Sequence, residues 1–393
     1  MNAYTSPRNP AGASVGLREA ADFSAAGGRH PPSVPGDRTS TAIAVARVLC
    51  IVGVVYVHAW TGLTGPQLVV SDHTPQGYLR WALAELFGRS AVPLLGMISG
   101  WLAVGAARKR SWGAFVLGKA RTILAPMVLW NAMAIVLVSG AAFAGMLRAP
   151  EPSSAWWTLN ELFCLVSPDN INVQMPFLRD LFVCMLAAPF LVRLPPEALI
   201  GVAVAALVWS VSGWSFPLLL RPAILLFFAV GMLARRFDAA AWIARRPIAW
   251  TMSPYVALAA FKVWFEAADG RAAARHAVVT AELDLLLRFA AALFFWSLAW
   301  RIAGSRAAGA LLRIEPYAFL LFCAHLILIW LAGPLIGLVT GPLGAPLYPA
   351  FLLAQPALVL AATLALGQFS VRMTPQTAAL LSGGRLKPAL LTV

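Results

Sequence analysis

The sequence predicts an all-α, polytopic integral membrane protein with about ten transmembrane helices. Hydrophobic residues make up 60% of the 393 residues and charged residues only 12%, whereas about a quarter of the residues of a soluble domain are charged. The mean hydropathy is +0.76. Apolar segments of about 20 residues, the length that crosses a bilayer, recur along the chain between short basic stretches.

The candidate spans follow one another from residue 42 onward. They are 42–62, 88–107, 122–145, 178–194, 197–212, 217–235, 247–265, 284–302, 315–338 and 346–367. Two consecutive prolines, Pro195 and Pro196, separate the fourth span from the fifth, because neither can continue a helix. The chain is therefore divided into a disordered N-terminal tail, 1–40, rich in Gly, Pro and Ser, a membrane domain, 41–367, and a C-terminal tail, 368–393.

Lys and Arg residues are distributed unevenly between alternate connections. The connections on the side of the N-terminus are basic, whereas those on the other side carry few such charges, several of them at helix starts. These helix-start arginines are Arg89, Arg179, Arg221 and Arg288. The bias places both termini in the cytoplasm. It also accounts for the net charge of +14 without nucleic acid, because the arginines cluster between apolar segments instead of following one face.

The cysteines do not have the spacing of metal ligands. They are Cys50, Cys164, Cys184 and Cys323. None of them forms a CxxC or a Cys/His pattern, so no metal is expected. We expect small packing residues instead of disulfides.

The first span contains two ionisable side chains, Arg47 and His58. Such groups are costly inside a membrane and usually mark function. They are eleven residues apart, about three helical turns, so both should project from one face about 16 Å apart. One helix would then present a cation near the cytoplasmic side and a base near the outer side of one cavity. The alternatives are an arginine that snorkels to the headgroups and a histidine packed at the interface.

Two of the outer connections are long. The first, 146–177, contains the run SSAWWTLNELFCLV, which predicts an interfacial amphipathic helix. The second, 266–283, mixes acidic and basic residues and is either a lid or an ordinary solvated connection.

The motifs of the chain, taken in order, resemble the membrane acyltransferase-3 family. Arg47 and His58 have the spacing found in the first helix of that family. The further motifs are RSAVPLLGMISGWL at 89–102, KARTILAP at 119–126, FLRDL at 177–181, FAVGML at 228–233 and YAFLLFCAH at 317–325. The resemblance covers 41–367. The chain departs from the family in its basic stretch, where Lys119 and Arg121 stand in place of two arginines three residues apart.

The resemblance implies an O-acyltransferase in the bacterial cytoplasmic membrane, surrounded by lipid. Its reaction would move an acyl group, usually acetyl, from cytoplasmic acyl-CoA to a hydroxyl of an extracytoplasmic carbohydrate. It leaves open whether a separate periplasmic protein completes the transfer. The residue chemistry agrees, because a neutral imidazole can deprotonate a hydroxyl and an arginine fork matches a phosphate.

The site residues follow from this reading, with His58 as the general base and Arg47 leading from the CoA entrance into the membrane. The residues assigned to the donor are Arg108, Lys109, Arg110, Lys119 and Arg121. The residues assigned to the acceptor are Arg89, Ser99, Arg179, Asp180 and His325. The plainer alternatives are topology charges for the donor set, and interfacial anchors, an ion pair or a helix-packing point for the acceptor set.

Two other functions remain open. A transporter or flippase could use Arg47, His58 and His325 as a proton relay. Against this, the two halves show no inverted repeat and no broken helices at matching positions. An inactive homologue that acts as a scaffold is the other alternative. Transfer of label from acetyl-CoA to a luminal glycan would separate these functions.

Overall fold

The structure is a computed structural model that describes residues 35–71, 74–166, 171–214, 216–268 and 277–386. In these residues it is a helical bundle without a sheet, as predicted, apart from an isolated bridge between Phe216 and Leu219. Several segments of the described chain are long and apolar enough to cross a membrane. They are Arg38–Val57, Pro75–Arg108, Trp112–Phe143, Val279–Ala303, Ala308–Thr340 and Tyr348–Met373. This confirms a polytopic membrane protein.

Every predicted span overlaps a helix. The α-helices are α1 (Pro35–Val57), α2 (Gly65–Ser71), α3 (Pro75–Ala82), α4 (Ser90–Arg108), α5 (Trp112–Lys119), α6 (Ala125–Ala134), α7 (Gly140–Phe143), α8 (Ala155–Phe163), α9 (Met175–Leu191), α10 (Pro196–Val211), α11 (Ala223–Arg236), α12 (Ala239–Ala244), α13 (Ile248–Ala268), α15 (Ala277–Ala303), α16 (Ala308–Thr340), α17 (Tyr348–Met373) and α18 (Pro375–Leu381). The π-helical segments are η1 (Leu83–Arg89), η2 (Ala120–Leu124) and η3 (Ile135–Ser139). The cytoplasmic location of both termini and the number of membrane crossings stay predictions.

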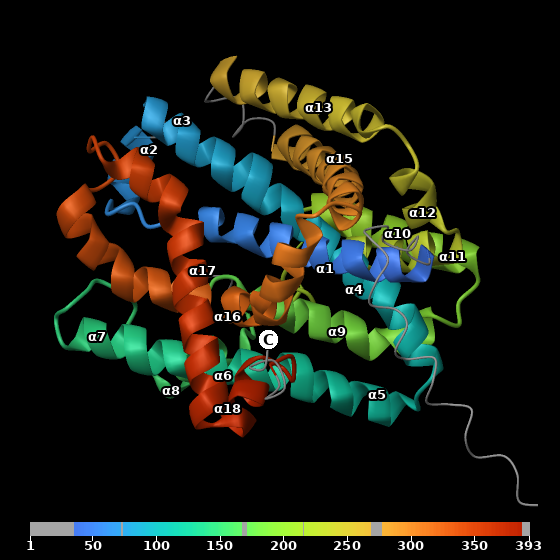
Figure 1. The fold of residues 1–393 in the computed structure, drawn as a ribbon, viewed down its shortest axis with the longest axis horizontal. Coiled ribbons are helices and arrows are strands. Elements are labelled where there is room, and N and C mark those ends of the chain that lie inside the picture. Colours follow the sequence, from blue (N-terminus) through green and yellow to red (C-terminus); the bar gives the residue numbers. More distant parts are fainter. Residues whose placement is uncertain (1–34, 72–73, 167–170, 215, 269–276, 387–393) are drawn as a thin grey trace, which may run out of the picture.

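Helix α1 lies in the middle of the bundle, packed against η1, α4, α15, α16 and α17 (Figure 1). It begins at Pro35, within the predicted N-terminal tail of residues 1–40, and the division of the chain into tail and membrane domain stays a prediction. Proline is well suited to a first helical turn. The helix is also held there by Arg38, whose guanidinium lies 4.9 Å from the centre of the Trp300 ring and donates a hydrogen bond to the Trp300 carbonyl.

Helix α1 ends at Val57, five residues before the predicted end of the first span. The chain leaves the helix because its next residues bind α17 instead. The Trp60 N–H donates to the Gln355 side chain at 2.9 Å. The Trp60 ring fills the space where Gly333 and Gly337 of α16 have no side chain. His58 therefore follows the helix and is not part of it.

The second and third helical runs are longer than predicted. The second starts at Pro75, where Thr74 caps α3 by accepting a hydrogen bond from the Gly77 N–H. The third extends from Trp112 to Phe143, so Lys119 and Arg121 lie within a helix and not in the predicted connection. The π-helical segment η2 immediately precedes the first turn of α6, which contains Pro126. Because proline has no backbone N–H, Pro126 cannot donate the regular helical hydrogen bond at this point.

Helices α4 and α11 make a close backbone contact. A Cβ added to Gly100 of α4 would lie 1.9 Å from the Phe228 carbonyl oxygen, and one added to Gly231 of α11 would lie 2.0 Å from the Met97 carbonyl oxygen. Only residues without a side chain let two backbones approach so closely. Gly100, the neighbour of the predicted acceptor residue Ser99, is thus a helix-packing point.

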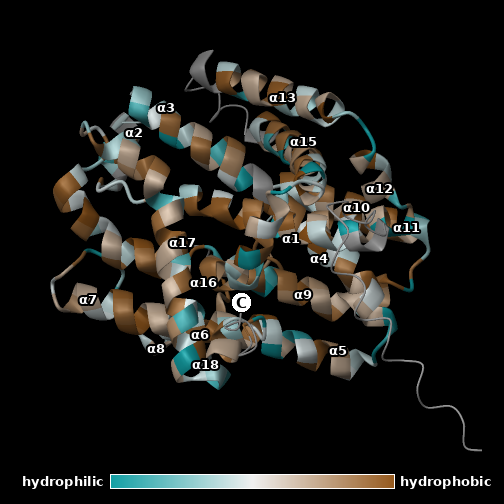
Figure 2. Cartoon of the chain, viewed as in Figure 1, coloured by the Kyte–Doolittle hydropathy of each residue, from teal (hydrophilic) through white to brown (hydrophobic). Residues whose placement is uncertain are grey.

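Hydrophobic residues predominate along the long helices (Figure 2), and several large apolar side chains are exposed. Val136, Phe143, Leu338 and Val339 are each more than 70% exposed. Lipid would remove such side chains from water, so this surface fits a membrane protein. All four cysteines are free and buried, in agreement with packing roles.

The predicted interfacial helix exists as α8. Ser154 caps it by accepting a hydrogen bond from the Trp157 N–H, and Trp156, Leu159 and Phe163 are exposed. Its place at the membrane interface remains a prediction. Of the second long connection, 266–283, residues 269–276 lie outside the described residues, and its two ends belong to α13 and α15.

The described part of the predicted C-terminal tail folds onto the bundle. Helix α17 continues to Met373, and α18 follows it. The Trp130 ring N–H of α6 donates to the Leu381 carbonyl at 3.0 Å, and Leu386 is 1% exposed. Part of this segment can therefore contribute to an internal site.

Candidate active site

In the described part of the chain, two cavities with polar lining residues lie along α1. The first, here called the His58 chamber, has a volume of about 440 Å³. Its polar lining residues are His58, Arg89, Gln174, Arg221 and Arg288. The second, here called the Arg47 chamber, has a volume of about 130 Å³. Its polar lining residues are Arg47, Ser99, Lys119, Glu315 and Arg385.

One stripe of α1 and its end faces both chambers. Arg47 and Ile51 line the Arg47 chamber, whereas Val54 and His58 line the His58 chamber. These spacings of three and four residues are those of one face of a helix, and His58 continues the stripe from the turn that follows the end of α1. The His58 side chain keeps the direction of the stripe because the backbone N–H of His58 donates to the Val55 carbonyl at 3.2 Å.

An aromatic pair separates the chambers. Phe177 of α9 and Phe322 of α16 line both cavities, and their ring centres are 5.8 Å apart. The sequence predicts one cavity from Arg47 to His58. The structure instead has two chambers with a shared aromatic wall, because these rings fill the middle of the passage.

Arg89 and Arg288, which line the His58 chamber, each pair with a carboxylate. Glu85 accepts from Arg89 at 2.5 Å, and Asp284 lies 3.9 Å from Arg288. Lys262 lies between the two carboxylates, 3.3 Å from Glu85 and 2.6 Å from Asp284, and its side chain is 4% exposed. Arg89, which the sequence analysis assigns to the acceptor, is thus one of the residues that line this chamber.

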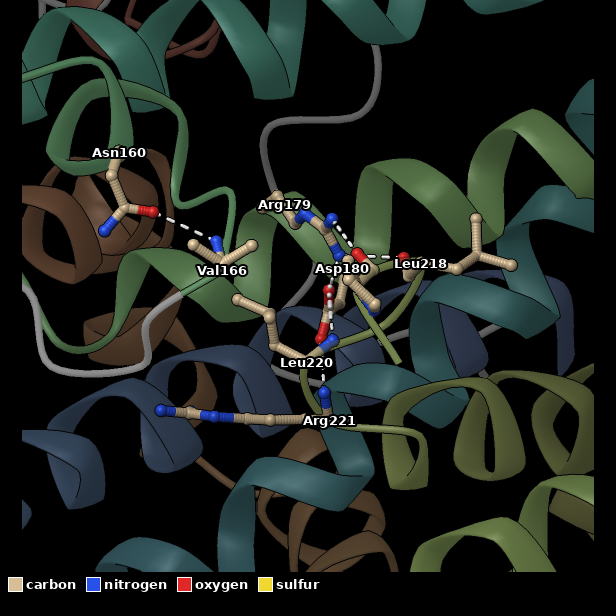
Figure 3. A network of polar contacts seen from close by, with 8 residues as sticks. Asn160, Val166, Arg179, Asp180, Leu218, Leu220 and Arg221 are labelled. Carbon is tan, nitrogen blue, oxygen red and sulfur yellow. Dashed lines mark hydrogen bonds and ion pairs between the residues drawn. The ribbon is translucent and has the colours of Figure 1, made fainter. Parts of the chain in front are cut away.

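Arg221 is positioned by the FLRDL motif (Figure 3). The buried Asp180 carboxylate accepts the backbone N–H groups of Leu220 at 3.2 Å and Arg221 at 2.7 Å. Arg179 pairs with Asp180 at 2.7 Å and also donates to the Leu218 carbonyl. Arg179 and Asp180 do not line the chamber in the described structure. They hold the loop from which the Arg221 side chain extends.

His325 lies next to His58. It is fully buried in α16, and its ring centre is 5.4 Å from that of His58. Its Nδ1 faces the carbonyl oxygens of Phe322 at 2.8 Å and Leu321 at 3.1 Å. His325 is absent from the described lining of the His58 chamber, so its predicted contact with the acceptor remains a prediction.

The Arg47 chamber combines cations with one carboxylate. Arg47 and Glu315 form an ion pair at 3.0 Å, and their side chains are 33% and 25% exposed. Lys119 and Arg385 supply further positive charge. Burial lowers the pKa of Arg385 to about 10, so it remains a cation at neutral pH. Ser99 uses its hydroxyl to donate to a backbone carbonyl of its own helix.

The other predicted donor residues are more peripheral. Arg108, Lys109 and Arg110 at the end of α4 are exposed, as is Arg121. Arg110 reaches over Gly118, one residue before Lys119. Their contact with a donor stays a prediction.

Several chamber residues are missing from the sequence-based site. Arg221 and Arg288 are counted there only as helix-start charges, and Arg385 only as a tail residue. Glu315 did carry a signal, since a carboxylate at the start of an apolar span is unusual. Among the described residues, no group of three or more His, Cys, Asp or Glu side chains is placed to hold a metal ion.

The fold and the two chambers define a multi-pass membrane protein with a charged internal passage that is interrupted by an aromatic pair. The chain belongs to the acyltransferase-3 family, whose sequence profile, described as "Acyltransferase domain", matches residues 41–367. The motif resemblance is thereby confirmed, and the protein is an acyltransferase.

A curated relative is also similar over most of its length. The succinoglycan biosynthesis protein ExoH of Rhizobium meliloti (strain 1021) is 26% identical over an aligned length of 367 residues, and the match covers 88% of this chain and 92% of that protein. No solved structure matches the chain significantly.

Proposed function

We propose that this protein transfers an acyl group, in the first instance acetyl, from cytoplasmic acyl-CoA to a hydroxyl of an extracytoplasmic carbohydrate such as a surface polysaccharide. Its place would be the bacterial inner membrane. The observation that carries the proposal is the α1 stripe, which presents Arg47 to one chamber and His58 to the next. The family supports acyl transfer. The name of the relative ExoH, which refers to succinoglycan biosynthesis, supports a polysaccharide acceptor.

The Arg47 chamber is suited to the donor. Three cations, Arg47, Lys119 and Arg385, face a single carboxylate, Glu315, so an anionic ligand would reduce their repulsion. The volume of about 130 Å³ is smaller than the roughly 300–1,000 Å³ of usual ligand pockets. We therefore place only a narrow part of the donor, such as the pantetheine arm, inside the chamber. The nucleotide would rest outside it, on the exposed basic residues at the end of α4 and in η2, which are Arg108, Lys109, Arg110 and Arg121.

The His58 chamber is suited to the acceptor. Its volume of about 440 Å³ falls within the usual range for a small-molecule site. Arg89, Arg221, Arg288 and Gln174 offer hydrogen-bond donors to sugar oxygens. His58 lines this chamber together with Phe177 and Phe322, which also border the Arg47 chamber.

The chemical step then uses His58 as the base. The neutral imidazole accepts the proton of the acceptor hydroxyl while the hydroxyl oxygen attacks the thioester carbonyl. A C–O bond forms, the C–S bond breaks, and the proton passes from His58 to the departing CoA sulfur. Guanidinium groups of the chamber stabilise the oxyanion that develops on the carbonyl oxygen. Phe177 and Phe322 must part for the thioester to reach the hydroxyl.

The test uses inverted membrane vesicles from a deletion strain that produces each variant, so that the host supplies the acceptor glycan. Labelled acetyl-CoA is added outside, and label on the luminal glycan is measured, with succinyl-CoA as a parallel donor. His58→Ala should lower the transfer rate by about 100-fold or more. Arg47→Lys should raise the KM for acyl-CoA, because the planar fork is lost.

Cys50→Ala is the matched control, because Cys50 is buried in the same helix and lines neither chamber. It should transfer at the rate of the parent protein. Full activity of His58→Ala would mean that the base lies elsewhere. Movement of an unmodified substrate without acylation would favour a transporter.

A further inference from the structure

A ring nitrogen of His325 has no partner in the described structure. Its Nε2 is buried and makes no hydrogen bond, although the side chain is 0% exposed. Buried polar atoms are nearly always hydrogen-bonded, so such an atom requires an explanation.

The other ring nitrogen determines the tautomer of His325. Nδ1 lies 2.8 Å from the Phe322 carbonyl oxygen and 3.1 Å from the Leu321 carbonyl oxygen. Both of these atoms can only accept, so Nδ1 carries the hydrogen and donates it. In the neutral ring, Nε2 is then a bare acceptor on the side that faces away from its own helix backbone.

His58 is the adjacent group that can use this acceptor. The ring centres are 5.4 Å apart, and the planes are inclined by 37°. When two imidazoles at this separation meet edge to edge, about 3 Å remains between the facing nitrogens, which is hydrogen-bond length. His58 itself borders the chamber. One of its nitrogens can therefore face His325 while the other faces the substrate.

We propose that His325 is a positioning residue for the base. A rotation of the His58 side chain brings its ring N–H to the free Nε2 of His325, and this hydrogen bond fixes the tautomer in which the other nitrogen of His58 presents its lone pair to the acceptor hydroxyl. The inference rests on the proposed function, in which His58 is the base. When His58 takes the proton, it becomes a cation, and its hydrogen bond to His325 strengthens.

A neutral acceptor suits this position. The charged groups that line the chamber around His58 are Arg89 of η1, Arg221 before α11 and Arg288 of α15. A carboxylate in place of His325 would attract these guanidinium groups as well as His58. A neutral imidazole orients the base without forming ion pairs.

The test compares His325→Phe with His325→Gln in the vesicle assay. Phenylalanine keeps a ring but has no acceptor, whereas glutamine carries an amide oxygen that can accept from His58. His325→Phe should lower the rate at saturating acetyl-CoA by about 10- to 100-fold, the usual effect of losing an orienting partner, and leave the KM for acetyl-CoA unchanged. His325→Gln should recover most of the lost rate.

Cys323→Ala controls for disturbance of α16, because Cys323 is buried two residues away and lines neither chamber. It should behave as the parent protein. Equal losses in His325→Phe and His325→Gln, or a change in KM alone, would overturn the positioning role. An inactive His58→Ala together with a fully active His325→Phe would refute this inference only. An active His58→Ala would refute the proposed function as well.

Discussion

The close contact between α4 and α11 gives the sharpest prediction for the fold. We consider Gly100→Ala, a change that adds one methyl group. The new Cβ would lie 1.9 Å from the Phe228 carbonyl oxygen and 2.8 Å from the Phe228 carbonyl carbon. Both are backbone atoms in a helix, so neither can rotate away.

The size of the effect follows from the distance that must open. Ordinary contacts of a Cβ begin at 3.4 Å, so the helices must separate by about 1.5 Å at this point. Overpacking of this kind costs about 1–3 kcal/mol. Helix α4 also carries Gly96 of the His58 chamber and Ser99 of the Arg47 chamber. Because a shift of about 1 Å in reacting groups can cost about 100-fold in rate, transfer should fall together with stability.

Gly231 of α11, the glycine on the other side of the same contact, provides a second test of the prediction. Gly231→Ala would place its Cβ 2.0 Å from the Met97 carbonyl oxygen in the same helix pair. One separation of the helices relieves both clashes. The double variant should therefore lose less stability than the sum of the two single losses, as neighbouring sites that share one structural change do.

The assay is the thermal unfolding midpoint in detergent, followed by tryptophan fluorescence, with vesicle transfer as the second readout. The matched control is Gly201→Ala in α10, because no atom lies within 4 Å of the added Cβ. It should leave the midpoint unchanged or raise it slightly, since alanine is the better helix former. Gly100→Ala should lower the midpoint by about 2–6 °C. Equal midpoints for Gly100→Ala and Gly201→Ala, or strictly additive losses in the double variant, would refute the reasoning.

Three further substitutions test the two chambers and their wall. Asp180→Asn should lower the thermal midpoint, because leaving Arg179 without its buried carboxylate costs about 3–5 kcal/mol. Glu315→Gln should lower the KM for acyl-CoA by up to about 5-fold. The donor then no longer has to break the partly exposed ion pair between Arg47 and Glu315, which is worth about 1 kcal/mol. A higher KM would mean that the Glu315 carboxylate orients Arg47. Phe322→Trp, which enlarges the wall between the chambers, should lower vesicle transfer by about 10-fold and leave binding of labelled acetyl-CoA intact.

The helices and the α1 stripe were predictable because both depend on local periodicity. A helix has 3.6 residues per turn wherever it lies, so the spacing of Arg47 and His58 was enough to place them on one face. The ends of the same helix were not predictable. Contacts with Trp300 at its start and with Gln355 after its end decide where it begins and stops. These partners are more than 200 residues away along the chain.

The composition of the chambers was only half predictable for the same reason. Motif order found Arg47, His58 and Lys119, because each lies in a recognisable local pattern. Glu315 reaches Arg47 across a sequence separation of 268 residues, and Arg385 enters through a segment beyond the family motifs. No local pattern connects such residues, since only the packed bundle brings them together.

The charges around His58 argue for a ligand and against a purely structural network. In the pairs described behind the chamber, two carboxylates, Glu85 and Asp284, serve three cations, Arg89, Lys262 and Arg288. Lys262 contacts both carboxylates, and Arg89, Arg221 and Arg288 line the chamber. Charged side chains inside a membrane protein are costly and are retained where they bind or react. The three arginines lie beside the proposed base, where an oxygen-rich acceptor and a developing oxyanion would need them.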